Sequence, residues 1–253
     1  MNDLKVSIIT PVFNGAKTIS DSLESVSMQS YKNIEHIVVD GLSTDKTIDI
    51  VKKHENKNMK FISEPDNGVY DALNKGIKLA SGDIIGILHS DDLYADKNVV
   101  SKISEYFSDI CIDGVYTDLV YVQKKDTDKI FRHWKSCDFC PDLLKKGWMP
   151  PHPTVFLRKS TYEKFGYFDT SYKIAADYDF MLQIFSNGAN LKYLPFISYK
   201  MRAGGMTNRS ISHIISKISE NLKTFRKYNI GSVSALLYKN FSKFEQFLKK
   251  GAV

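Results

Sequence analysis

A short apolar run at residues 84–88 (IIGIL) is followed at once by four polar residues, His89, Ser90, Asp91 and Asp92. An apolar run of this length is typical of a buried strand in a parallel sheet. Open α/β sheets bind ligands in the crevice beyond the carboxyl ends of their strands, and the acidic pair falls there. Carboxylate oxygens in such a place suit Mg²⁺ or Mn²⁺, usually shared with the phosphates of a substrate. The alternative is that Asp91 or Asp92 caps the following helix.

Apolar periodicity predicts alternating strands and helices ahead of this run. Strands are expected at residues 5–10, 34–39 and 60–63, and a helix at residues 71–80 precedes the run itself. Between the strands, apolar residues recur at the i, i+4 and i+7 spacing of a helix lying on a sheet. This alternation predicts an α/β fold with a Rossmann-like, mostly parallel sheet flanked by helices. The sequence contains neither GxGxxG nor GxxxxGK[ST], so it does not indicate a dinucleotide-dependent dehydrogenase or a P-loop NTPase.

The second part of the chain carries further strand and helix patterns. Two strands around a polar turn are expected as a hairpin at residues 114–123 and 130–134. A further strand is expected at residues 154–157, and a helix at residues 176–187 opens with Asp177 and Asp179. Acids in a first turn also complement the helix dipole, which is the structural alternative for this pair.

The net charge of +6 is concentrated near the C-terminus, where residues 209–250 carry nine Lys or Arg and two Asp or Glu. Apolar residues recur at helical spacing over residues 211–225 and 233–247, which predicts C-terminal amphipathic helices with a basic face. Such helices can contact an anionic membrane surface, or pack on the catalytic domain or on a second subunit as a homodimer. Nucleic acid is not an expected partner, because no aromatic stacking platform accompanies the charge.

The length of 253 residues allows one large α/β domain with an appendage. We expect a catalytic domain at residues 1–207 and a basic helical extension at residues 208–253. No apolar run approaches the roughly 18 residues of a membrane span, and no signal-peptide pattern follows Met1. The expected location is therefore the cytoplasm, with a peripheral position on the inner face of the cytoplasmic membrane if the tail binds lipid.

Several motifs occur in the order and spacing of family 2 glycosyltransferases, and the chain resembles this family over residues 4–207. The resemblance implies the glycosyltransferase A fold, an inverting mechanism, a nucleotide-diphosphate sugar donor and a divalent metal, Mn²⁺ or Mg²⁺. It divides the catalytic domain into a nucleotide-binding half at residues 1–95 and an acceptor-side half at residues 96–207. The motifs are Pro11-Val12-Phe13-Asn14, DGLSTD at residues 40–45, residues 66–76, Ser81-Gly82-Asp83, Ser90-Asp91-Asp92 and Ala176-Asp177.

The resemblance also implies roles for individual residues around the donor. The acid corresponding to Asp40 accepts the imide N–H of uracil in the family, which favours UDP or dTDP. Asp91 corresponds to a metal ligand, with Asp92 beside it as a second candidate, and His89 stands where many members have an acid. Arg202 is expected to pair with phosphate oxygens. The remaining residues assigned to the nucleotide are Pro11, Val12, Phe13, Asn14, Asp71, Asn74, Lys75 and Ser90.

Asp177 occupies the position of the family's catalytic base, with Ala176 where the family usually has another acid. A carboxylate within hydrogen-bond reach can take the proton of an acceptor hydroxyl as that hydroxyl attacks the sugar. Trp148 and His152 fall in the acceptor-side region and are the candidates for contact with the acceptor. Core packing is the alternative for Trp148.

The sequence therefore predicts a metal-dependent glycosyltransferase of the hexosyltransferase type. Its donor is expected to be a UDP-sugar, and its acceptor a hydroxyl of a glycan or lipid-linked acceptor in surface polysaccharide synthesis. One alternative is a sugar-phosphate nucleotidyltransferase, although residues 11–15 lack the Lys and Arg that its phosphate loop needs. The other is a non-catalytic sugar-nucleotide-binding module.

Overall fold

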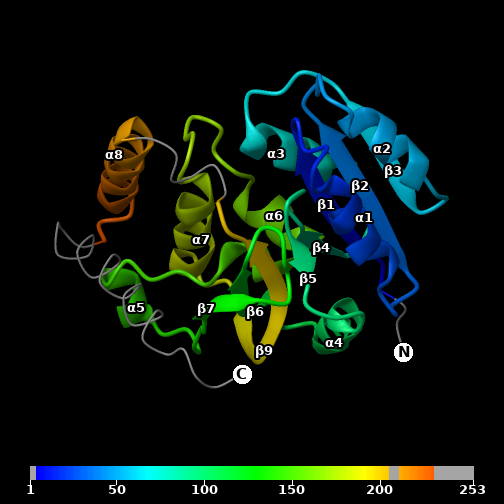
Figure 1. Ribbon diagram of the computed structural model, residues 1–253. Helices are drawn as coiled ribbons and strands as arrows, with labels where there is room; N and C mark the ends of the chain where they lie inside the picture. The colour runs from blue at the N-terminus through cyan, green and yellow to red at the C-terminus, as the bar shows by residue number, and fades with distance from the viewer. Residues whose placement is uncertain (1–3, 205–210, 231–253) are drawn as a thin grey trace.

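The N-terminal half of the chain forms four parallel strands (Figure 1). The structure, a computed structural model, describes residues 4–204 and 211–230. The four strands are β1 (Val6–Val12), β2 (Ile34–Asp40), β3 (Met59–Ser63) and β4 (Ile84–Ile87). Their order in space is β3-β2-β1-β4, and all three pairings are parallel. The carboxyl ends of these strands therefore lie at one edge of the sheet, as predicted.

Helices cover both faces of this half-sheet. The helices are α1 (Ile19–Ser27), α2 (Thr47–His54) and α3 (Val69–Leu79). Val38 of β2 packs with residues of α1 and α2, whereas its neighbours Ile37 and Val39 pack with residues of α3. Successive side chains of a strand point to opposite faces, so α3 lies across the sheet from α1 and α2. Cover on both faces explains why β1 and β4 are buried along their whole length.

The second half of the chain continues the same sheet with mixed pairings. Its elements are β5 (Leu93–Tyr94), α4 (Val99–Tyr106), β6 (Gly114–Val122), β7 (Ile130–Trp134), α5 (Pro141–Lys145), η1 (His152–Thr154), β8 (Phe156–Arg158), α6 (Lys159–Phe165), α7 (Ala176–Ser186), β9 (Leu191–Arg202) and α8 (Ile211–Lys227). The full order is β3-β2-β1-β4-β8-β6-β9-β5, with β7 on β6. The predicted α/β fold and the hairpin of β6 and β7 are confirmed.

The two halves of the sheet meet where β8 pairs antiparallel with β4 through two residue pairs. Gly86 of β4 faces the ring of Phe156 in β8, and a Cβ at Gly86 would overlap that ring. The absence of a side chain at this position allows the two strands to approach closely.

Strand β9 was not predicted, because Pro195 interrupts its sequence and proline is rare inside strands. The structure accommodates Pro195 at an irregularity, where the register of β9 with β6 shifts between Tyr116 and Asp118. The first strand, predicted at residues 5–10, extends two residues further, because Pro11 and Val12 are paired residues of β1. Strand β4 pairs with β1 only as far as Ile9. The missing N–H of Pro11 therefore removes no hydrogen bond between β1 and β4.

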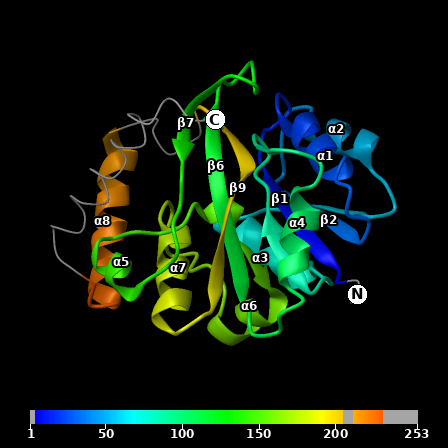
Figure 2. The ribbon, with the colours of Figure 1, turned by 90° about the horizontal axis from the view of Figure 1, so that it is seen from below.

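The predicted helix over residues 211–225 is present as α8, and it lies beside α7 in both views (Figures 1 and 2). Thr224 and Phe225 of α8 are buried. The second predicted tail helix, at residues 233–247, and the boundary at residue 207 lie outside the described residues. None of the helices in the described ranges has the length and apolar character needed to span a bilayer.

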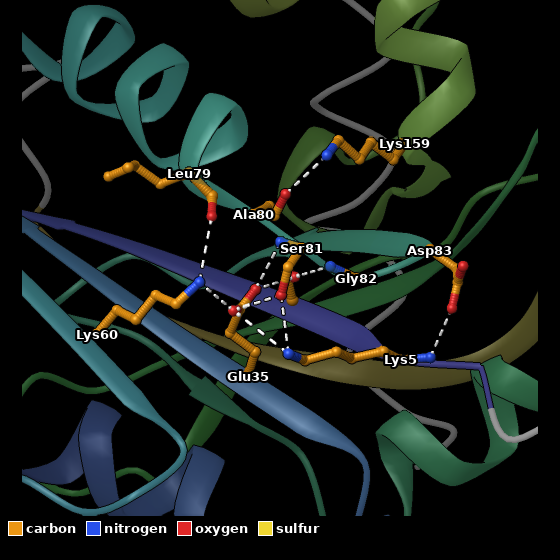
Figure 3. A network of polar contacts seen from close by, with 10 residues as sticks. Lys5, Glu35, Lys60, Leu79, Ala80, Ser81, Gly82, Asp83 and Lys159 are labelled. Atoms are coloured by element: carbon orange, nitrogen blue, oxygen red, sulfur yellow. Dashed lines mark hydrogen bonds and ion pairs between the residues drawn. The ribbon is translucent and has the colours of Figure 1, made fainter.

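A buried carboxylate, Glu35, ties together strands β1, β2 and β3 and the loop before β4 (Figure 3). It accepts hydrogen bonds from the Ser7 hydroxyl at 2.7 Å and from the backbone N–H of Ser81 at 2.9 Å, and it pairs with Lys60 at 2.6 Å. Burial alone would raise the pKa of Glu35, but these donors outweigh it and lower the pKa from 4.5 to about 2.

Glu35→Gln is expected to lower the free energy of unfolding by about 2 kcal/mol at pH 7, because the donors around it lose a charged acceptor. A lowered pKa in the folded state contributes stability above pH 4.5 that is lost as the pH falls towards 2. The difference between variant and wild type should therefore shrink over that window in urea unfolding curves. The exposed Glu105→Gln is the control, and an equal loss in both variants would contradict this role for Glu35.

Candidate active site

Asp40 is the last residue of β2 and is fully buried. Its Oδ2 accepts hydrogen bonds from the backbone N–H of Ser43 at 3.0 Å and from the Ser63 hydroxyl at 2.6 Å. Its Oδ1 has no hydrogen-bond partner among the described residues. A buried carboxylate oxygen without a partner is costly, so this oxygen is suited to accept an N–H from a ligand.

The loop after β1 is fastened to the loop after β2. The Asn14 side-chain oxygen accepts the backbone N–H groups of Thr44 at 2.9 Å and Asp45 at 3.3 Å. Asn14 therefore holds the two loops together. Its neighbour Phe13 is a large apolar side chain that stays 63% exposed. Leu42, which the sequence did not single out, is also exposed, after Asp40. These two apolar side chains are available to contact a flat ring.

The predicted nucleotide residues of α3 mainly contact the protein. Asn74 forms two hydrogen bonds with the backbone of Phe168, donating to its carbonyl at 2.8 Å and accepting its N–H at 3.1 Å. Lys75 pairs with Glu64 at 2.9 Å. Asp71 accepts the backbone N–H of Asn67 at 3.0 Å and lines a cavity of about 240 Å³ between the start of α3 and residues 170–173. Of the three, Asp71 is the one that lines this cavity.

The two acids after β4 have different environments. Asp92 is 2% exposed, and its Oδ1 accepts the backbone N–H of Arg202 at 2.8 Å. Burial and then the neighbouring Asp91 raise the pKa of Asp92 well above its usual range. The side chain of Asp91 remains partly exposed. Asp91 is therefore the more accessible of the two predicted metal ligands, and metal binding by either of them stays a prediction.

Arg202, at the end of β9, lies beside this acidic loop as the prediction requires of a phosphate partner. One terminal nitrogen donates to the Asp91 carbonyl at 2.9 Å, and the other pairs with the Asp21 carboxylate of α1. The Nε of Arg202 is buried without a partner in the described part of the chain. Asp21 had no sequence signal, because an acid in the first turn of a helix is common.

Asp177 lies in the first turn of α7 and is held on both oxygens. Its Oδ2 is 2.9 Å from Nδ1 of His152, and its Oδ1 is 3.2 Å from the Tyr70 hydroxyl of α3. The side chain keeps 16% exposure. His152, a predicted acceptor contact, thus lies against the predicted base, and Tyr70 is a partner that sequence reasoning missed. Asp177 is oriented by donors while part of it stays open.

His89 connects the acidic loop with Asp177. Its ring lies 5.9 Å from the ring of His152 in an edge-to-face arrangement. Burial and then His152 lower the pKa of His89 to about 4, while Asp91 and Asp177 oppose that shift. The loop after β4 and the start of α7 are therefore neighbours, although they are far apart in the sequence.

Trp148 packs against an aromatic cluster. Its ring centroid lies 6.0–6.1 Å from those of Tyr116, Phe139 and Phe185. Trp148 is partly buried among these rings, so the packing role that was its alternative is present. Contact of its remaining surface with an acceptor stays a prediction.

The sequence profile described as Glycosyl transferase family 2 matches residues 7–177, more than half of the chain. The chain belongs to glycosyltransferase family 2. It is 29% identical over 208 residues to a PGL/p-HBAD biosynthesis glycosyltransferase of Mycobacterium bovis, covering 80% of this chain and 78% of that protein. It is 34% identical over 183 residues to an uncharacterized glycosyltransferase of Mycobacterium tuberculosis, covering 70% of this chain and 68% of that one.

Solved glycosyltransferases share the fold of this family 2 member. S. aureus TarS 1-349 in complex with UDP-GlcNAc superposes with a TM-score of 0.66 at 19% identity, covering 89% of this chain and 71% of that one. The mannosyltransferase PcManGT from Pyrobaculum calidifontis, in complex with GDP-Man and Mn²⁺, gives 0.64 at 18% identity, covering 99% and 76%. When aligned with another structure of TarS 1-349, this chain covers 60% of the TarS chain. The predicted glycosyltransferase A fold is confirmed.

Proposed function

We propose that this glycosyltransferase inverts the anomeric centre as it moves a sugar from a nucleoside diphosphate to an acceptor hydroxyl, with Asp177 as the base. The observation that carries the proposal is the placement of Asp177. It is held by His152 and Tyr70, keeps an open edge, and is linked by His89 to the loop that carries Asp91.

In this proposal Asp177 takes the proton of the acceptor hydroxyl as its oxygen attacks the anomeric carbon. The bond to the nucleoside diphosphate breaks on the opposite face, so a single displacement inverts the configuration. His152 and Tyr70 keep the carboxylate in one orientation, which is what a base needs to act on a hydroxyl within about 3 Å.

We favour a uridine nucleotide because of Asp40. Uracil offers a single imide N–H, which matches the single carboxylate oxygen that Asp40 has without a partner. Guanine presents two adjacent donors and would need both oxygens, one of which already binds Ser43 and Ser63. The exposed ring of Phe13 would stack on the base. UDP and UDP-GlcNAc are bound in TarS, whereas PcManGT binds GDP-Man.

A divalent cation, Mn²⁺ or Mg²⁺, fits the residues around Asp91. Among the described residues, no group of three or more His, Cys, Asp or Glu side chains is placed to hold a metal. Sites shared with a nucleotide commonly need only one or two carboxylates, since phosphates and water complete the shell, and Asp91 supplies one. When bound, the cation would neutralise charge on the departing diphosphate. Arg202 would add positive charge beside it.

The proposed acceptor is a glycan or a lipid-linked acceptor of surface polysaccharide or glycolipid synthesis. The support is the name of the mycobacterial relative, a PGL/p-HBAD biosynthesis glycosyltransferase.

Hydrolysis of a panel of UDP-, dTDP- and GDP-sugars with Mn²⁺ tests the donor. Release of free sugar from UDP-sugars supports the proposal. Binding of UDP without any release would favour a non-catalytic module, and formation of a sugar phosphate and nucleoside triphosphate with pyrophosphate would favour a nucleotidyltransferase.

We further propose that α8 contacts an anionic membrane surface with the side that faces away from α7. Ile215, 62% exposed, and Ile218 are apolar side chains on this helix that lack cover among the described residues. Ile215→Asp should weaken flotation with vesicles containing anionic lipid, and added salt should weaken wild-type binding. Ser216→Asp, which adds the same charge at an exposed neighbour, is the control. Equal flotation of Ile215→Asp and wild type would contradict the contact.

A further inference from the structure

Glu220 of α8 binds the backbone just ahead of the helix that carries Asp177. Its Oε1 accepts the N–H of Lys173, and its Oε2 accepts the N–H groups of Ile174 and Ala175, each at 2.9 Å. Ala175 is the N-cap residue of α7, and it has no side-chain oxygen to cap the helix. Glu220 therefore supplies, from another helix, acceptors for the N–H groups of residues 173–175, including that of the N-cap residue, and it adds to the negative charge of Asp177 and Asp179 in the first turn.

A second contact fixes α8 to the other side of Asp177. Lys227 donates to Oδ2 of Asp179 at 2.7 Å, and Asp179 is almost completely buried. The ring of Phe225 meets that of Tyr178 edge to face at 5.8 Å. Helix α8 thus contacts the residues before and after Asp177, which agrees with its place beside α7 in Figures 1 and 2.

Tyr70 connects the segment that Glu220 holds with the side chain of Asp177. The Tyr70 hydroxyl lies 2.7 Å from the carbonyl of Ile174 and 3.2 Å from Oδ1 of Asp177. Glu220 binds the N–H of the same Ile174. Any shift of residues 173–175 would therefore move the hydroxyl that orients Asp177.

We propose that Glu220 is a positioning residue for Asp177, and that α8 is in this way part of the catalytic unit. The inference rests on the proposed role of Asp177 as base. Glu220 lies beyond residues 7–177, the part that the family profile matches, so the family assignment does not reach it. A displacement of a base by about 1 Å can cost about 100-fold in rate, so a cap of this kind has a measurable effect.

The test is Glu220→Gln, with the exposed Glu163→Gln of α6 as the control. Glutamine keeps the size of the side chain but presents an NH₂ group where an oxygen accepts an N–H. We expect turnover to fall about tenfold, while UDP affinity and the KM for the donor stay within about twofold of wild type. Glu163→Gln should leave all three unchanged. If Glu220→Gln only reduced the amount of folded protein, turnover per folded molecule would stay at the wild-type value. Circular dichroism measures the folded fraction for this correction.

A double-mutant cycle with Tyr70→Phe tests the route. If Glu220 acts through Ile174 and Tyr70, the loss in the double variant should be smaller than the product of the two single losses. Losses that multiply, or a Glu220→Gln enzyme with wild-type turnover, would overturn the proposal. Glu220→Asp keeps the charge on a shorter side chain, and it should fall between Gln and wild type. It also replaces Glu220→Gln if that variant does not fold.

A measurement without turnover separates this inference from the proposed function. Hydrogen exchange of peptides covering residues 170–180 should speed up in Glu220→Gln and stay unchanged in Glu163→Gln. The ring ¹⁵N shifts of His152 report its contact with Asp177, and they should move in Glu220→Gln alone. Unchanged exchange and shifts would refute the positioning role. Wild-type turnover in Asp177→Asn would instead refute the base assignment, whatever the exchange results.

Discussion

Asp177→Asn is expected to lower turnover at least about 100-fold while leaving UDP affinity close to that of wild type. Asparagine has nearly the same shape, and its single amide oxygen can still accept a hydrogen bond from Tyr70 or from His152, so the fold around it should persist. It cannot take up a proton from the acceptor at neutral pH. Turnover measured by UDP release, together with UDP binding by calorimetry, separates loss of the base from loss of the donor site.

The control for this variant is Asp142→Asn. Asp142 also lies in the first turn of a helix, α5, and its side chain is exposed. If the role of Asp177 were only to complement the dipole of α7, both variants would show small losses of stability and ordinary turnover. A turnover of Asp177→Asn within twofold of wild type would exclude Asp177 as the base.

Asp91→Ala is expected to remove the metal-dependent part of UDP binding. Asp91 is the partly exposed acid of the loop after β4, so its loss should take away the carboxylate that holds a cation against the diphosphate. Calorimetric titration of UDP with Mn²⁺ and with a chelator should give two different affinities for wild type and a single weak one for the variant.

The matched comparison is Asp92→Asn at the next position. Asp92 is buried, and its Oδ1 accepts the N–H of Arg202, a hydrogen bond that the amide oxygen of asparagine can keep. Burial and Asp91 raise the pKa of Asp92 and disfavour its charged form, so the fold should tolerate this substitution. Folded Asp92→Asn protein should still bind UDP more tightly with Mn²⁺ than with a chelator. The reverse pattern, with metal dependence lost in Asp92→Asn and kept in Asp91→Ala, would show that the two roles have been exchanged.

Local pattern was sufficient for the first half of the fold. Its strands alternate with helices that carry regular apolar stripes, so the parallel direction of the strands followed from the sequence, whereas their spatial order β3-β2-β1-β4 was not predicted. Strand β9 was missed because Pro195 breaks its pattern, and its pairing with β6 depends on residues far away in the chain. A strand of this kind is stabilised by tertiary contacts that no short window contains.

Motif positions located the site but did not separate ligand contacts from supporting contacts. Asn74 and Asp92 belong to motifs of the family, yet the structure places them on backbone groups of Phe168 and Arg202. Conversely, Tyr70 contacts Asp177 from 107 positions away, and Glu220 contacts residues 173–175 from 45 to 47 positions away. Residues this far apart in the sequence become neighbours only in the folded chain. Reasoning from a single sequence does not predict such contacts.

The short seam between β4 and β8 joins the parallel part of the sheet, in which β2 ends at Asp40, to the mixed part that precedes Asp177 of α7. At this seam Gly86 leaves no room for a side chain against Phe156. The size of the residue at position 86 therefore limits how closely these two parts of the sheet can approach. If Asp177 is the base, a larger residue there is expected to reduce turnover without changing any residue that contacts the donor or the acceptor.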